Sequence, residues 1–133
     1  LTKCVDVFVS LHRAEGFGLV LAEAMYVGTP TIATNWSANT EFMNSDVACM
    51  VDYKMIEIKE DIPPFKKGYR WADADIDQAA GYMKRLYEDK AFYQEIKDNA
   101  YKYVRKRLSM ERSAKIVADR ISEIYSKKNG EEK

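Results

Sequence analysis

The sequence contains few of the residues that build disulfide frameworks, metal centres or membrane spans. Its 133 residues include two cysteines, Cys4 and Cys49, and a single histidine, His12. Two cysteines without a C-x-x-C pair indicate free thiols in a reducing compartment rather than a disulfide scaffold or a zinc site. No apolar run approaches the roughly 20 residues that span a bilayer, and the first ten residues lack the basic leader of a signal peptide. These absences predict a cytoplasmic protein.

The sequence also has no excess of positive or negative charge. Lys and Arg together number 21, Asp and Glu together number 21, and the formal net charge is zero. A protein that binds the phosphate backbone of a nucleic acid concentrates positive charge, so we expect no nucleic-acid partner. A chain of this length suits one compact domain with one core.

The hydrophobic pattern predicts an α/β fold. A strand over Val5–Ser10 precedes a helix over Gly18–Val27, which Gly28 ends, and a second strand over Pro30–Thr34 follows. Strand, helix and strand form a βαβ unit with a right-handed crossover, hence a Rossmann-like parallel sheet with flanking helices. Ala48–Tyr53 is a third, shorter strand. The first strand is apolar on both faces, which is typical of a strand inside a parallel sheet, so we expect the chain to be a piece of a longer protein.

The second half of the chain reads as a loop followed by helices. Residues 54–72 contain Pro63, Pro64 and Gly68 and predict an irregular surface loop. From Asp75 onward the pattern is helical, with Asp75 and Ser109 as N-caps, and residues 127–133 are expected to fray. The apolar stripes of this all-helical C-terminal section are Ile76, Ala79, Ala80, Met83, Leu86 and Tyr87, then Phe92, Ile96, Ala100, Tyr103 and Val104, then Ile116, Val117, Ile121 and Ile124.

A glycine turn, Gly16-Phe17-Gly18, joins the first strand to its helix and predicts a phosphate site. Backbone N–H groups converge at the start of a helix, and the helix dipole adds partial positive charge there. The turn also lies at the carboxyl end of a parallel strand, where open α/β sheets bind ligands. The dinucleotide fingerprint G-x-G-x-x-G does not fit, because its third glycine position holds Leu21 and the loop is too long.

Two carboxylates, Glu15 and Glu23, flank this turn. Glu23 is the only charged residue between Gly16 and Gly28, and a buried, unpaired carboxylate costs several kcal/mol. Glu23 therefore lies at a wet edge, pairs with Arg13 or Arg70, or meets a polar ligand. A nucleotide-sugar satisfies both features, because its diphosphate accepts from the amides while its hydroxyls donate to carboxylates. Glu23 lies about 7 Å farther along the helix axis, a distance that suits a ribose.

The segment from Glu15 to Glu23 resembles the E-x7-E signature of retaining glycosyltransferases of family 4, which have the GT-B fold. Gly28–Thr34 resembles the next strand of that family, and Trp71-Ala72 with Asp75 resembles the start of its following helix. The resemblance identifies residues 1–133 as part of the C-terminal, donor-binding domain. It implies transfer of a hexose-type sugar from a nucleotide-sugar, with retention, in polysaccharide biosynthesis. The acceptor is an unknown glycan, lipid-linked molecule or protein.

The resemblance also assigns roles to residues. Glu15 contacts the donor sugar as the catalytic residue, Glu23 holds the ribose, and the amides of Gly16, Phe17, Gly18 and Leu19 contact the diphosphate. His12 and Arg13 either contact donor phosphate or sugar, or belong to a solvated loop. No metal or other cofactor is implied, so the D-x-D pattern Asp73-Ala74-Asp75 is assigned to helix capping.

The sequence departs from the family in three ways. The acceptor domain, and the upstream strands that carry a basic pair in relatives, are not in this sequence, so we expect the fragment to be inactive alone. Ser37-Ala38-Asn39 stands where relatives usually have a glycine. The alternative from a different functional class is a non-catalytic α/β binding or assembly module.

Two surface features are candidates for contact with another molecule: the apolar stripe of the last helix and a cluster of basic residues. The stripe of the last helix is expected to face the missing domain, so its exposure would favour self-association. A basic cluster is either a solvated helix face, which we prefer, or a contact with an anionic membrane at its cytoplasmic face. The cluster comprises Lys97, Lys102, Arg105, Lys106 and Arg107.

Overall fold

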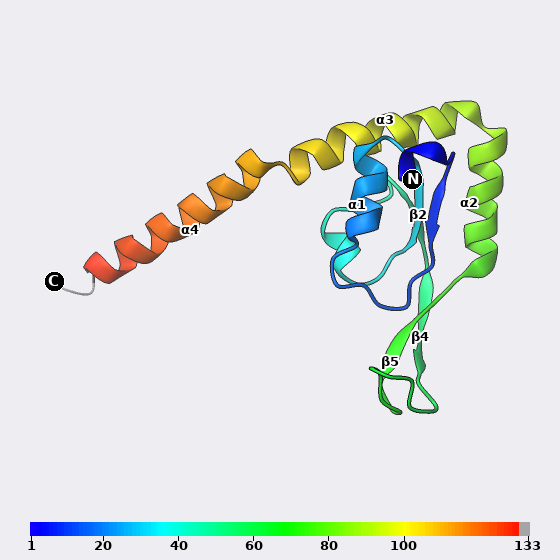
Figure 1. The fold of residues 1–133 in the computed structure, drawn as a ribbon, viewed down its shortest axis with the longest axis horizontal. Helices are drawn as coiled ribbons and strands as arrows, with labels where there is room; N and C mark the ends of the chain where they lie inside the picture. The colour runs from blue at the N-terminus through cyan, green and yellow to red at the C-terminus, as the bar shows by residue number, and fades with distance from the viewer. Residues whose placement is uncertain (131–133) are drawn as a thin grey trace.

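The computed structural model describes residues 1–130, which form a parallel sheet between helices (Figure 1). Strands β1 (Phe8–Ser10), β2 (Thr31–Thr34) and β3 (Cys49–Val51) lie in the order β1-β2-β3, and both pairings are parallel. Helices α1 (Leu19–Tyr26) and α3 (Lys90–Arg107) cover one face, and α2 (Ile76–Glu88) covers the other. The predicted α/β class, with its flanking helices and helical C-terminal section, is confirmed.

The central strand β2 joins two apolar layers because its side chains alternate between the faces of the sheet. Ala33 packs into the layer formed by α1 and α3, and Ile32 packs into the layer formed by α2. Cys49 lies in the second layer, where burial raises the pKa of its thiol to about 12 against the opposing effect of Arg85. Cys4 is exposed, and neither cysteine is in a disulfide, as predicted.

Two glycines in the left-handed region bound α1 and so place the predicted site. Gly18 is the N-cap, with φ +90°. At the other end Gly28, with φ +80°, donates to Met25 O (3.0 Å), and Thr29 donates to Ala24 O (2.9 Å). This pair of bonds is a Schellman motif, which requires a left-handed residue after the C-cap. The predicted role of Gly28 in ending the helix is confirmed.

The prediction of the first strand is wrong in two respects. The strand begins at Phe8 rather than Val5, because Thr2–Cys4 form a short 3-10 helix (η1). In the described residues β1 is an edge strand whose Val9 side is 38% exposed, so β1 is not buried on both faces. Its three residues pair only with β2, and an edge strand leaves its outer backbone groups without a strand partner.

The predicted surface loop over residues 54–72 is also wrong. Strands β4 (Tyr53–Glu57) and β5 (Arg70–Ala74) pair antiparallel and form a hairpin that projects from the sheet (Figure 1). Trp71 and Ala72 consequently lie in a strand and not at a helix start. The prolines and Gly68, which suggested an irregular segment, lie in the connection between the two strands. Residues 38–41 form a 3-10 helix (η2, Ala38–Glu41).

The helical section follows its predicted caps. Gln78 N donates to Asp75 Oδ1 (2.9 Å) at α2, and Arg112 N donates to Ser109 Oγ (3.1 Å) at α4 (Met110–Gly130). Helix α4 projects away from the body (Figure 1), and every residue from Met110 to Lys127 is exposed. The expected exposure of its apolar stripe is thus confirmed. The tail predicted to fray from residue 127 begins within this helix, and residues 131–133 lie outside the described part.

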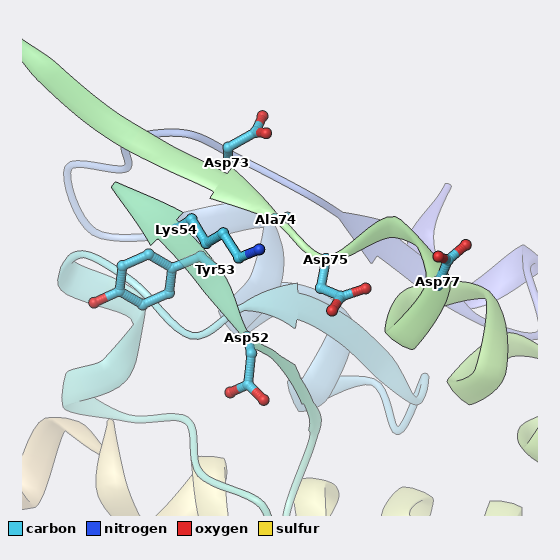
Figure 2. Close-up of a pocket in the computed structure, with 7 residues that line it drawn as sticks. All are labelled: Asp52, Tyr53, Lys54, Asp73, Ala74, Asp75 and Asp77. Atoms are coloured by element: carbon cyan, nitrogen blue, oxygen red, sulfur yellow. The ribbon is translucent and has the colours of Figure 1, made fainter. Parts of the chain in front are cut away.

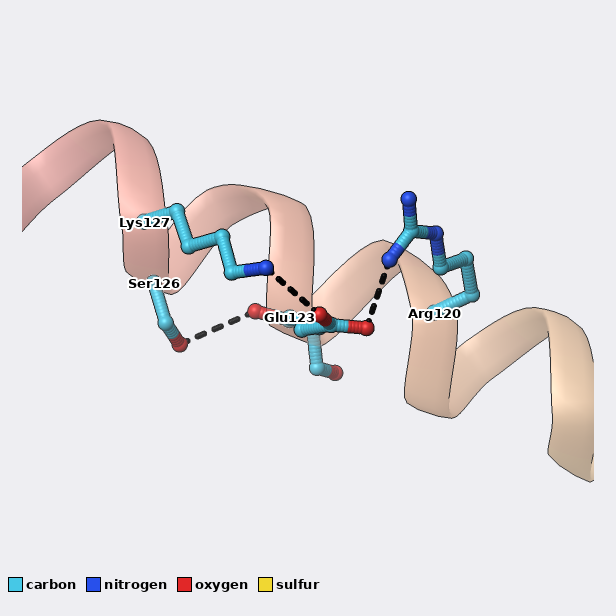
Figure 3. Close-up of polar contacts among 5 residues, drawn as sticks. Arg120, Glu123, Ser126 and Lys127 are labelled. Atoms are coloured by element: carbon cyan, nitrogen blue, oxygen red, sulfur yellow. Dashed lines mark hydrogen bonds and ion pairs between the residues drawn. The ribbon is translucent and has the colours of Figure 1, made fainter.

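Two exposed ion pairs of α4 share the carboxylate of Glu123. Figure 3 shows Arg120 and Lys127 reaching the carboxylate of Glu123 at 2.7 and 2.8 Å. Hydrogen bonds from Lys127 and then Arg120 lower the pKa of Glu123. Because these i,i+3 and i,i+4 pairs are exposed to solvent, they contribute little to the stability of the helix. Among residues 1–130, no helix combines the length and the apolar character needed to cross a membrane.

Candidate donor-binding site

The backbone amides of the glycine turn bind the side-chain carboxylate of Glu15, which precedes the turn. Glu15 is half-buried, and its Oε1 accepts from the N–H of Gly16 (2.9 Å) and, at longer range, from that of Phe17 (3.4 Å). A carboxylate oxygen here stands where the phosphate oxygen of a ligand was predicted. The amides of Gly16 and Phe17 thus converge on one acceptor oxygen.

The N-terminus of α1 places further backbone N–H groups, without a partner inside the helix, next to this turn. The first N–H groups of a helix have no partner within the helix, and in the described residues no side chain caps α1 through Gly18. Leu19 and Val20 are 62% and 49% exposed. The positive end of the helix dipole therefore meets solvent beside Glu15.

Glu23 is exposed on the outer side of α1. Neither predicted ion-pair partner reaches it, because Arg13 pairs with Asp73 (3.1 Å) and Arg70 donates to Met55 O (3.2 Å). Although Glu23 is its only charged residue, α1 is covered only on its inner side, and Leu19, Val20 and Tyr26 are exposed. Of the three readings, the wet edge is the one this structure contains. A carboxylate at this exposed position pays no desolvation penalty and is accessible to a ligand.

His12, which follows β1, forms hydrogen bonds to the loop that follows β2. Its Nε2 lies 2.9 Å from Trp36 O and 3.1 Å from Asn39 Oδ1. Both are acceptors, so Nε2 carries the proton and donates, which leaves Nδ1 to accept from Ser10 Oγ at 3.4 Å. Asn39 is fully buried and donates in turn to Thr34 O (3.0 Å).

Arg13 is engaged on the hairpin side of the same loop. Its guanidinium lies 4.6 Å from the Trp71 ring centroid and donates to Asp73, while Ala72 N donates to Arg13 O (3.1 Å). The hairpin and the loop that bears Glu15 are thereby joined. Both residues predicted to face the donor thus have structural partners that hold the loop.

One residue that the sequence did not assign lies at the centre of the site. Ser37 Oγ donates to Glu15 O (2.6 Å) and accepts from Glu15 N (3.1 Å). Ser37 has φ +81° and ψ −160°, a conformation close to glycine's own region. The presence of Ser37 where relatives usually have a glycine was the one sequence signal that this residue is unusual. Its contact with the backbone of Glu15, 22 residues away, was not predictable from the sequence.

The D-x-D pattern has structural partners. Asp73 binds Arg13, and Asp75 caps α2. Both line a cavity of about 330 Å³ at the base of the hairpin, with Asp52, Lys54 and Asp77 (Figure 2). Figure 2 shows the carboxylates of Asp73 and Asp75 pointing in different directions. In the part of the chain that the structure describes, no three acidic, histidine or cysteine side chains gather closely enough to hold a metal ion.

Replacing Gly18 with alanine is expected to destabilise the fold by about 1–3 kcal/mol, because an L-residue is strained at positive φ. Its Cβ would also lie 3.1 Å from Leu21 Cδ1 and 3.3 Å from Asn39 Cβ. Gly16→Ala is the matched control, since no atom lies within 4 Å of its Cβ, and its effect should stay within about 0.5 kcal/mol. Urea denaturation measures both, and equal effects would contradict this account of the turn.

A protein family and several solved structures are similar to this chain. The family model described as glycosyl transferases group 1 matches residues 1–103. The chain belongs to this family. No curated protein sequence matches this chain.

Solved structures show the same fold. HepE (Alr3699) from Anabaena, in complex with UDP and glucose, superposes with a TM-score of 0.66 at 18% identity over 92% of this chain and 28% of its own. The C-terminal domain of the group 1 protein LpcC from Francisella tularensis gives 0.58 at 22% over 82% and 46%. Sucrose-phosphate synthase from Thermosynechococcus elongatus gives 0.65 at 21% over 94% and 27%. The chain thus spans between about a quarter and a half of these chains, and it has the fold of a GT-B C-terminal domain.

Proposed function

We propose that this domain binds the nucleotide-sugar donor of a retaining, family 4 type glycosyltransferase that transfers a hexose-type sugar. One observation carries the proposal: the half-buried Glu15 and the exposed Glu23 lie on either side of a turn and helix start, and the turn amides of Gly16 and Phe17 already bind an anion. A diphosphate is the ligand group that fits the amides. Hydroxyl-bearing sugars on both sides of that diphosphate fit the carboxylates.

The roles follow from the charge that each group meets. The diphosphate displaces the Glu15 carboxylate from the amides of Gly16 and Phe17 and also accepts from those of Gly18 and Leu19. The released carboxylate then accepts from the donor sugar. Glu23 accepts from ribose hydroxyls. During transfer the bond between the anomeric carbon and the diphosphate oxygen breaks. A bond from that carbon to the acceptor's hydroxyl oxygen forms, the hydroxyl gives its proton to the departing diphosphate, and negative charge grows on that diphosphate as it leaves. Fixed amides and the helix dipole stabilise that charge without reorganising.

The remaining predicted residues border this surface. His12 holds the loop of residues 36–39 and Arg13 holds the hairpin, so we assign both to shaping the site around the donor. The acceptor, an association with membranes and a self-association through α4 remain predictions from the sequence. The proposal requires no metal, because helix-terminus amides supply the electrostatic stabilisation.

Ligand-observed NMR with a panel of nucleoside diphosphates and their sugars tests the proposal. HepE is solved with UDP, glucose and UDP-glucose, so uridine nucleotides are tested first. We expect a signal for at least one nucleoside diphosphate and a stronger one for its sugar conjugate. The matched nucleoside without phosphates should give none, because it cannot use the amides. Absence of binding across the panel would contradict the proposal.

A further inference from the structure

We propose that Ser37 is a positioning residue that sets the backbone of Glu15 for contact with the donor sugar; this inference rests on the proposed function. A single hydroxyl binds both backbone groups of Glu15, donating to its carbonyl at 2.6 Å and accepting from its N–H at 3.1 Å. The two residues are 22 positions apart. This contact therefore joins the glycine turn to the loop that follows β2.

The backbone of Ser37 indicates that the hydroxyl is needed there. Its φ of +81° and ψ of −160° belong to a region that glycine adopts freely and other residues adopt only when surrounding contacts hold them. Glycine would fit the backbone better but would lose both bonds to Glu15. Thr40 supports the strained conformation, since its Oγ1 (2.7 Å) and N–H (3.2 Å) both donate to Ser37 O.

The loop that carries Ser37 is itself fixed from the opposite side. His12 donates to Trp36 O and Asn39 Oδ1, and the buried Asn39 donates to β2. Ser37 is thus held between a braced loop and Glu15. By contrast, the carboxylate of Glu15 contacts only exposed amides of the turn. Its backbone is fixed while its side chain is free to exchange partners.

This arrangement separates two parts of donor binding. The amides of the turn bind the diphosphate once the Glu15 carboxylate has released them, and that step does not depend on the direction in which the released side chain then projects. The contact with the sugar depends on the place from which that side chain projects, and small displacements of a positioned group weaken such contacts strongly. Loss of the Ser37 hydroxyl should therefore affect binding of the sugar while leaving binding of the diphosphate nearly unchanged.

Ser37→Ala and Ser37→Gly test this inference together. Both remove the hydroxyl, but only glycine relieves the strain at positive φ. The measured quantity is the sugar increment, defined as the Kd of the nucleoside diphosphate divided by that of its nucleotide-sugar. We expect the increment to fall about fivefold or more in both variants, as for one lost hydrogen bond, while the Kd of the nucleoside diphosphate changes less than about twofold. Hydrogen exchange at the Glu15 amide should accelerate in both.

The outcomes are distinguishable. An unchanged increment, or equal weakening of both ligands, would overturn the role of Ser37, the second result indicating a purely structural contact. Recovery of the increment in Ser37→Gly alone would overturn it too, because strain rather than the hydroxyl would then be decisive. If the unmodified chain binds no nucleotide, the proposed function itself fails, and this inference fails with it.

Discussion

Replacing Glu15 with alanine is expected to tighten the binding of a nucleoside diphosphate by about five- to tenfold while abolishing the preference for its sugar conjugate. In the free domain the Glu15 carboxylate occupies the amides of Gly16 and Phe17. A diphosphate must displace this anion, and a charge-assisted hydrogen bond contributes about 1.5–3 kcal/mol. Alanine removes the competing anion and its repulsion toward phosphate, and at the same time removes the acceptor proposed for the sugar.

Isothermal titration calorimetry with the nucleoside diphosphate and the nucleotide-sugar measures both effects. Glu15→Gln separates them, because glutamine removes the charge but retains an oxygen acceptor. It should give an intermediate gain for the diphosphate and an intermediate loss of sugar preference. Weaker binding of the diphosphate in Glu15→Ala would contradict the exchange of anions at the turn. Unchanged sugar preference would contradict the contact between Glu15 and the sugar.

Glu23→Gln is expected to weaken the nucleoside diphosphate and the nucleotide-sugar alike, by about tenfold or more. Hydrogen bonds from two ribose hydroxyls to a carboxylate are stronger than those to an amide, and a loss of 1.4 kcal/mol is tenfold in Kd. The ribose is common to both ligands, so the sugar increment should not change. This pattern is the opposite of that expected for Glu15.

The control for this substitution is Glu95→Gln, which removes a carboxylate from the exposed surface of α3 and should leave both affinities unchanged. Thermal unfolding should be unaffected in both variants, because Glu23 is exposed and the described residues place no basic group on it. A stability loss in Glu23→Gln without a change in affinity would favour a binding or assembly module over a donor site.

Local rules predicted the part of the fold that bears the site. Gly28 ends α1 because its φ is positive, and the apolar residues of β2 pack against helices on both faces. The hairpin was missed because Pro63, Pro64 and Gly68 obscured the strands beside them. The antiparallel pairing joins residues between 13 positions (Glu57 with Arg70) and 21 positions (Tyr53 with Ala74) apart. It depends on tertiary contacts that a local pattern does not contain.

The candidate site was predictable in its motif and not in its contacts. The spacing of Glu15 and Glu23 around a glycine turn indicated a ligand with a phosphate and hydroxyls. The exposure of Glu23 depends on which sides of α1 are covered, which an almost uniformly apolar helix does not reveal. The bond between Ser37 and Glu15 depends on a loop conformation that serine rarely adopts.

Mapping a nucleoside diphosphate onto the backbone amides of this chain by two-dimensional NMR tests the central claim most directly. The account predicts that titration shifts the amide signals of residues 16–19 most strongly, because the diphosphate replaces the Glu15 carboxylate on the amides of Gly16 and Phe17 and accepts from the next two. The signal of Glu23 should follow with the same Kd. Shifts confined to the cavity beside Asp52 and Asp75, or to the basic end of α3, would contradict the account.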